Sequence, residues 1–165
     1  MTQTGETSYA TIRHVLIVDD EVEFVKTLKR HLKRQSFTLK TASDGCEAME
    51  LMGRMAGEEG AFDLVVSDVV MPNMDGIQLL EEIKECYPET SVLLLTGFGE
   101  NGMAGGAIRK EMDDFHQKPI TPQKMLELIH HIDERRSINM GLQGADLHDD
   151  TNHLEKEHGS KQSRL

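Results

Sequence analysis

Acidic residues stand directly after two strongly apolar segments of this chain. Asp19 and Asp20 follow residues 15–18, and Asp68 follows residues 62–67. Apolar runs of this length are typical of buried strands in a parallel sheet. Ligands of open α/β sheets bind outside the carboxyl ends of the strands, so we expect the three aspartates to share one pocket.

Three carboxylates in one pocket create an electrostatic problem that a cation would solve. At about 4 Å and an effective dielectric constant near 20, each pair repels by roughly 4 kcal/mol. Mg²⁺ prefers hard oxygen ligands, retains several waters and usually sits beside phosphate. The set Asp19, Asp20 and Asp68 therefore predicts a Mg²⁺ site with room for a phosphoryl oxygen. Taken singly, each acid has an ordinary alternative as a helix N-cap.

Two further strand ends carry groups that would complement a phosphoryl group. Thr96 follows an apolar run and offers a hydroxyl donor, and Gly97 leaves space for a ligand beside the backbone. Lys118 follows a shorter strand-like segment and offers a positive charge. The bond between Lys118 and Pro119 is one in which the cis form costs little. Anionic, cationic and hydroxyl groups are thus expected to converge from four strand ends.

Strand-like and helix-like segments alternate along residues 12–136. The expected strands cover residues 14–18, 37–41, 62–67, 91–95 and 115–118. The expected helices are 21–35, a segment that Asp44 caps and that ends at residues 57–60, 76–86, a weak segment 107–112, and a final helix capped by Thr121. This alternation predicts an α/β fold with a doubly wound, five-stranded parallel sheet and helices on both faces. We expect the flavodoxin-like strand order 2-1-3-4-5, with ligands at the switch point between the first and third strands.

The composition indicates one folded domain with polar ends. The chain has 165 residues, 38% of them hydrophobic, and no apolar run approaches the roughly 20 residues of a membrane span. We expect residues 1–11 to form a flexible N-terminus, residues 12–136 the folded domain, and residues 137–165 a disordered tail. Cys46 and Cys86 are far apart in sequence, which favours two reduced thiols in a cytoplasmic protein.

The charge distribution limits the partners that the chain would bind. A formal net charge of −11 argues against direct DNA binding, because phosphate contact needs a basic face. Residues 26–34 form a basic run within this acidic chain. That run is either a docking face for a protein partner or a solvated helix face with nearby acidic pairs.

Taken together, the motifs resemble a receiver domain of the response regulators of bacterial two-component signalling, with the chemotaxis-regulator type of fold. The most specific motif is Asp-x-x-Met-Pro-x-Met-Asp-Gly at residues 68–76. The supporting motifs are Val-Asp-Asp-Glu at 18–21, Leu-Thr-Gly at 95–97 and Asp-Phe-x-x-Lys-Pro at 114–119. They occur in the order and spacing of the family, and the resemblance covers residues 12–136.

The resemblance implies a chemical role for each matched residue. Asp68 would accept a phosphoryl group from the phosphohistidine of a histidine kinase or a histidine phosphotransfer protein. Asp19, Asp20 and the backbone carbonyl of Val70 would help to hold Mg²⁺. Lys118 would pair with the phosphoryl oxygens.

The resemblance also implies a switch. Thr96 would hydrogen-bond to the phosphoryl group, and its movement would vacate space into which Phe115 turns. A plain core aromatic is the alternative for Phe115.

Three functions follow, and the first is favoured. It is a phosphorylatable single-domain response regulator, which is not an enzyme but takes part in phosphoryl transfer and in its own dephosphorylation. Phosphorylation would switch a surface that binds an unknown downstream protein. Three roles are open for Ile120, Met125 and the final helix: that binding surface, a homodimer contact formed on phosphorylation, or part of the core. The alternative is a receiver-like interaction module that works without phosphorylation. The third function is a phosphatase that works through an aspartyl phosphate. It is disfavoured, because such an enzyme would need a second aspartate at position 70, where this chain has Val70.

Overall fold

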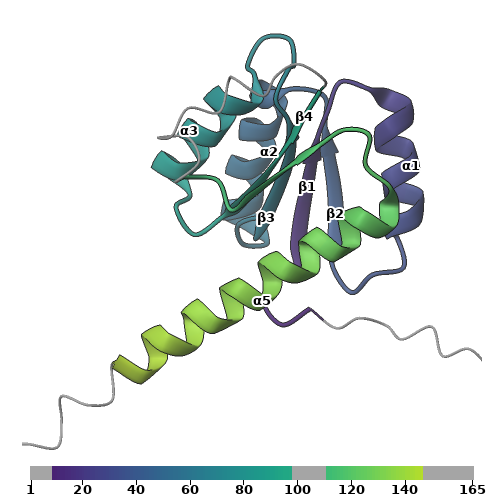
Figure 1. Ribbon diagram of the computed structural model, residues 1–165. Coiled ribbons are helices and arrows are strands. Elements are labelled where there is room, and N and C mark those ends of the chain that lie inside the picture. Colours follow the sequence, from purple (N-terminus) through teal and green to yellow (C-terminus); the bar gives the residue numbers. More distant parts are fainter. Residues whose placement is uncertain (1–8, 98–110, 147–165) are drawn as a thin grey trace, which may run out of the picture.

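The computed structural model describes residues 9–97 and 111–146, which form a central sheet between two pairs of helices (Figure 1). The strands are β1 (His14–Val18), β2 (Thr38–Ala42), β3 (Leu64–Asp68), β4 (Ser91–Thr96) and β5 (Asp114–Gln117). The helices in the described residues are α1 (Val22–Leu32), α2 (Gly45–Glu58), α3 (Gly76–Cys86) and α5 (Pro122–Asp146). All strand pairs are parallel, in the order β2-β1-β3-β4-β5. The predicted fold class and strand order are confirmed, whereas the weak helix predicted at 107–112 falls almost entirely outside the described residues.

The sheet is buried on both faces because its central strands carry continuous apolar runs, residues 15–18, 64–66 and 92–95. In β1, Val15 and Ile17 pack in the cluster that contains α1 and α5 residues. Leu16 and Val18 point to the opposite face and pack in the cluster that contains α2 and α3 residues. Successive side chains of a strand alternate between faces, so one continuous apolar run supplies both layers of the core.

The helix starts follow the predicted caps. The Asp44 side chain accepts a hydrogen bond from the Glu47 backbone N–H at the start of α2. At the start of α5, the Thr121 hydroxyl accepts from the Lys124 N–H at 3.1 Å. Side-chain oxygens at these positions satisfy N–H groups that have no partner within the helix.

The final helix contributes chiefly to the core on its first three turns. Met125, Leu128, Ile129 and Ile132 are all buried, as their helical spacing predicts. Ile120, just before the helix, is also buried. Of the alternatives for Ile120 and Met125, the structure therefore supports the core.

The prediction of a flexible N-terminus is wrong for residues 9–11. Tyr9 is buried and packs edge-on against Phe37, with ring centroids 5.1 Å apart. The backbone N–H groups of residues 10–12 donate to the Asp133 carboxylate in α5 at 2.7–3.0 Å. These partners are separated by more than a hundred residues, so local sequence patterns do not reveal them.

The prediction of a disordered tail is wrong for residues 137–146. Helix α5 continues to Asp146 and extends past the sheet (Figure 1). Ile138 and Met140 on this extension are 62% and 48% exposed, so burial does not drive it. Adding a residue to an existing helix avoids the cost of nucleation, which explains how the helix continues with little burial. Residues 147–165 lie outside the described part of the chain.

Within residues 9–97 and 111–146, no helix combines the length and the apolar character that crossing a membrane requires.

Asp133 anchors the start of the chain to α5, and its loss should destabilise the fold. Burial raises the pKa of this carboxyl, but hydrogen bonds from the Thr11 hydroxyl and from three backbone N–H groups outweigh burial and lower it overall. Asp133→Ala would leave buried donors without an acceptor, so we expect a loss of roughly 3 kcal/mol in the free energy of unfolding measured in urea. Glu134→Ala, at an exposed neighbouring position, should change it by less than about 0.5 kcal/mol.

The pH dependence gives a second readout of the same anchor. A carboxyl with a lowered folded-state pKa contributes its full stability above the unfolded pKa, and that contribution is lost as the pH falls toward the folded pKa. The difference between the parent and Asp133→Ala should therefore shrink in acid. A difference that stays constant down to the folded-state pKa would contradict the anchoring role.

Candidate functional site

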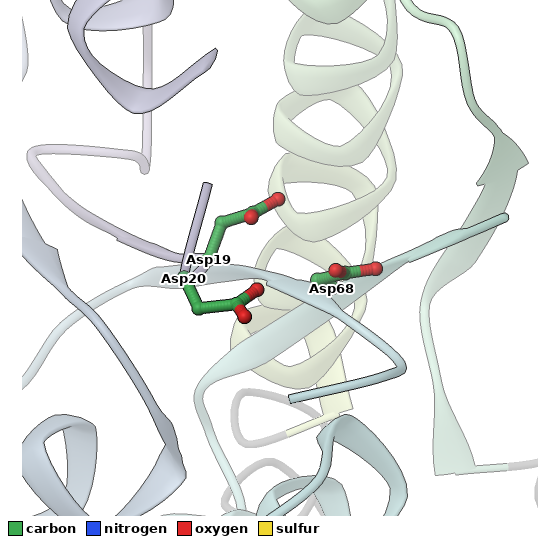
Figure 2. A group of neighbouring side chains, drawn as sticks. All are labelled: Asp19, Asp20 and Asp68. Atoms are coloured by element: carbon green, nitrogen blue, oxygen red, sulfur yellow. The ribbon is translucent and has the colours of Figure 1, made fainter. Parts of the chain in front are cut away.

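The sheet register places the predicted acidic residues side by side. Val18 at the end of β1 pairs with Ser67 in β3, so Asp19 and Asp68 come next on adjacent strands. Figure 2 shows Asp19, Asp20 and Asp68 gathered at these two strand ends. One carboxylate oxygen from each lies within 4.8 Å of the others. The structure thus brings together the three acids that the sequence predicts in one pocket.

The three carboxylates differ in their exposure to solvent. Asp19 is 3% exposed, the Asp68 side chain is 13% exposed, and Asp20 is exposed. The Glu21 backbone N–H donates to Asp19 Oδ1 at 2.8 Å, which fixes that carboxylate at the entry to α1. Charges this close repel, and burial reduces the screening by water. The cluster therefore needs positive charge nearby.

Lys118 supplies a positive charge to the cluster. Its Nζ lies 2.6 Å from Asp19 Oδ2, 3.5 Å from Asp68 Oδ2 and 3.8 Å from Glu21 Oε2. Burial lowers the pKa of the Lys118 ammonium, but the hydrogen bond and charge of Asp19, with the charges of Asp68 and Glu21, raise it overall. Lys118 consequently stays protonated near neutral pH.

The backbone around Lys118 is tied to the adjacent strand. The Lys118 N–H donates to the Thr96 carbonyl at 2.7 Å. The Lys118–Pro119 peptide bond is cis, a form that costs little before proline.

Thr96 stands beside Asp68 with an unsatisfied hydroxyl. Asp68 pairs with Leu95 in the sheet register, so Thr96 is the next residue along the neighbouring strand. Its Oγ1 is buried and finds no hydrogen-bond partner among the described residues. A buried hydroxyl without a partner costs about 1–3 kcal/mol, and a ligand oxygen would remove that cost.

The loop after Asp68 is held at both of its ends. The Val69 N–H donates to the Leu95 carbonyl, and the Gly76 N–H donates back to the Val69 carbonyl. A Cβ at Gly76 would overlap the Asp68 carbonyl oxygen, so only glycine allows α3 to begin this close to the acid. Val70, whose carbonyl the resemblance assigns to the metal, lies within this loop.

The middle of the same loop is fastened to α2. Asn73 has a φ of 66°, and its side-chain amide donates to Asp44 Oδ2 at 2.8 Å. Two hydrogen bonds lower the pKa of Asp44: the larger effect comes from the Glu47 backbone N–H and the smaller from the Asn73 side chain. The residues that follow Asp68 are thereby positioned by two neighbouring elements.

Phe115 lies in the edge strand of the sheet. It belongs to β5 and is 39% exposed. The alternative of a plain core aromatic is therefore wrong, while the predicted switch role stays a prediction.

Two residues near Lys118 were not among the predicted site residues. Glu21 adds a fourth carboxylate, and its position directly after the aspartate pair was an available signal. The Phe24 ring centroid lies 4.5 Å from Lys118 Nζ. Nothing in the sequence connects an aromatic residue of α1 with a lysine near the end of the fold.

The donor set fits a divalent cation with a bound anion. Carboxylate oxygens are the hard ligands that Mg²⁺ prefers, and few protein ligands leave coordination positions for water and phosphate. The orphaned Thr96 hydroxyl and the Lys118 ammonium lie where they would meet an anion on Asp68. This arrangement is suited to phosphoryl transfer, in which positioning and charge neutralisation dominate.

Comparisons with known proteins point to one family. The chain matches the family profile described as response regulator receiver domain over residues 15–130. The transcriptional regulatory protein SrrA of Staphylococcus aureus is 34% identical over 112 residues, which cover 68% of this chain and 44% of that relative. The chain thus spans less than half the length of the curated relatives it matches.

Solved structures agree in fold and in family. A response regulator receiver domain protein from Clostridium thermocellum is 27% identical, with a TM-score of 0.67 over 77% of this chain and 98% of that one. The receiver domain of NtrX from Brucella abortus is 30% identical, with a TM-score of 0.64 over 73% and 98% of the two chains. Because the family match spans most of the chain and agrees with the strand order and the acidic pocket, this chain belongs to the response regulator receiver domain family.

Proposed function

We propose that this protein is a phosphorylatable response regulator whose phosphoacceptor is Asp68. The observation that carries the proposal is the convergence of three carboxylates, one ammonium group and one unpartnered hydroxyl at adjacent strand ends. The donor would be the phosphohistidine of a histidine kinase or of a histidine phosphotransfer protein. Phosphorylation would switch a surface that binds a downstream protein or a second copy of this chain.

The transfer forms one bond and breaks one. A carboxylate oxygen of Asp68 attacks phosphorus, the new O–P bond forms, and the P–N bond to the donor histidine breaks. The electron pair of that bond stays on the imidazole nitrogen, which is protonated from solvent. The carboxylate acts as a nucleophile and forms a covalent intermediate. We therefore propose a phosphoacceptor that takes part in phosphoryl transfer and in its own dephosphorylation. We do not propose that it is an enzyme acting on a separate substrate.

The other groups neutralise and orient charge. Mg²⁺, held by Asp19, Asp20, Asp68 and the Val70 carbonyl, would neutralise the carboxylates and the phosphoryl oxygens. Lys118 would transfer its hydrogen bond from Asp19 to a phosphoryl oxygen, because its Nζ already lies 3.5 Å from Asp68 Oδ2. The buried Thr96 hydroxyl would donate to a second phosphoryl oxygen. Its movement would give Phe115, now exposed, a place to turn inward.

A groove beside the acidic cluster supports docking of the phosphoryl donor. The groove has a volume of about 280 Å³ and lies between α1, the end of β2 and the start of α2, where Glu47 also lines it. Asp19 lines it together with Lys26 and Lys29 of the basic run. Glu23 partly offsets this charge through an ion pair with Lys26 at 3.1 Å. We favour the docking role of the basic run, because two of its lysines line a groove that Asp19 also lines.

The prediction of no direct DNA contact rests on net charge alone. The comparisons do not support it, because the curated relatives carry the name transcriptional regulatory protein. We place the phosphoryl exchange in the cytoplasm, where the free and exposed thiols of Cys46 and Cys86 would remain reduced.

Phosphorylation by acetyl phosphate tests the acceptor directly. With Mg²⁺ present, the parent protein should gain the mass of one phosphoryl group in intact-protein mass spectrometry, and Asp68→Asn should gain none. Asp75→Asn is the matched control, because Asp75 belongs to the same loop but caps α3, and asparagine also caps helices. Phosphorylation of Asp68→Asn would contradict the assignment. A folded parent that accepts no phosphoryl group would favour the phosphorylation-independent interaction module.

Lys118 and a divalent cation compete for Asp19, so removing the lysine charge should tighten Mg²⁺ binding. We expect Lys118→Met to raise the Mg²⁺ affinity about tenfold by calorimetry, part of the roughly 4 kcal/mol that a unit charge exerts at about 4 Å. The same variant should accept phosphate more slowly. Lys84→Met, whose ammonium lies 3.5 Å from Asp113, is the control and should bind Mg²⁺ like the parent. Equal or weaker Mg²⁺ binding by Lys118→Met would show that the two cations do not compete.

A further inference from the structure

Phe24 occupies a distinctive place next to the proposed site. It lies in the first turn of α1, one helical turn after Asp20. The side chain is partly buried and packs against the core cluster shared by α1 and α5. The element that follows the acidic pair therefore also delivers an aromatic ring to the edge of the pocket.

The ring faces the ammonium group of Lys118. The distance from Lys118 Nζ to the Phe24 ring centroid is 4.5 Å, within the range of a cation–π interaction. Three carboxylates lie within 3.8 Å of the same nitrogen. The lysine side chain is 18% exposed, so the ammonium is held between acidic oxygens and an aromatic face.

These two kinds of partner behave differently when the site is loaded. The Asp19 oxygen, at 2.6 Å from Lys118 Nζ, is also a ligand that a divalent cation would take up. The aromatic ring attracts the ammonium without competing for any carboxylate, because the attraction comes from its quadrupole. Phe24 can therefore keep hold of Lys118 while the lysine exchanges Asp19 for a phosphoryl oxygen.

Holding the ammonium matters because lysine is a flexible residue. Its four-carbon stem carries about 2 kcal/mol of rotamer entropy, and a lysine released from Asp19 would otherwise sample solvent. An interaction present before and after the exchange confines the side chain to the pocket. This effect would speed the transfer by preorganisation.

We propose that Phe24 is a positioning residue for phosphoryl transfer, which acts by holding the Lys118 ammonium beside Asp68 through a cation–π contact. This inference rests on the proposed function. In this proposal, the effect of Phe24 passes through Lys118 and not through contact with the phosphoryl group.

The test compares Phe24→Leu, which keeps apolar packing but removes the aromatic face, with Phe24→Tyr, which keeps both. Acetyl phosphate with Mg²⁺ is the probe, and mass spectrometry follows the rate of phosphorylation. We expect Phe24→Leu to slow phosphorylation about 3- to 10-fold, as the loss of a partly buried cation–π contact implies. Phe24→Tyr should stay within about twofold of the parent. Phe24→Met serves as a second non-aromatic variant should the leucine variant fold poorly.

A double-mutant cycle separates positioning from general packing. In the Lys118→Met background, Phe24→Leu should have no further effect beyond about twofold, because the partner through which it acts is gone. An equal slowing in both backgrounds would overturn the proposal and assign Phe24 to packing alone. Parental rates for both non-aromatic variants would overturn it as well.

A readout without phosphate or metal distinguishes this inference from the proposed function. The protons on Cε of Lys118 should resonate upfield of other lysines in the parent and in Phe24→Tyr, because of the ring current, and should return to the usual position in Phe24→Leu. The absence of this shift in the parent would overturn the contact itself. If the shift is present but the parent accepts no phosphoryl group at Asp68, the proposed function fails and the positioning role fails with it. If the parent is phosphorylated and Phe24→Leu reacts at the parental rate, only the positioning role fails.

Discussion

The crowding of three carboxylates at two adjacent strand ends is the constraint around which the site is organised. The pairing of Val18 with Ser67 fixes the backbones of Asp19 and Asp68 on adjacent strand ends. Lys118 offsets part of the negative charge from the opposite side of the pocket. The remaining negative charge favours binding of a divalent cation. The cation would in turn allow a negatively charged carboxylate to approach a phosphoryl group.

The scaffold resists the repulsion by fixing the loop that follows Asp68. Gly76 lets the start of α3 lie against the Asp68 carbonyl, and Asn73 attaches the centre of the loop to the cap of α2. Functional groups need such support, because a small misplacement weakens every interaction at the reacting atom.

Sequence reasoning identified the sheet and the acids because both depend on local patterns. Continuous apolar runs marked the buried strands, and the residues after each run marked the edge where Asp19, Asp68 and Thr96 meet. The features that escaped it depend on partners distant in the chain. Asp133 binds residues 10–12 across more than a hundred residues, and Phe24 contacts Lys118 only after α1 and β5 have folded onto one sheet. The extension of α5 escaped for a different reason, since a helix once formed can continue without burying side chains.

The most direct measurement of the central claim compares the parent with Asp20→Asn in urea unfolding, without divalent cations and then with saturating Mg²⁺. Asp20 is exposed, so the substitution removes a charge and little packing. If charge crowding governs the site, Asp20→Asn should be at least as stable as the parent in chelator. The parent should gain about 2.7 kcal/mol at a Mg²⁺ concentration a hundredfold above its dissociation constant, and the variant should gain much less at that concentration. A variant that is less stable than the parent in chelator and gains equally from Mg²⁺ would contradict the claim.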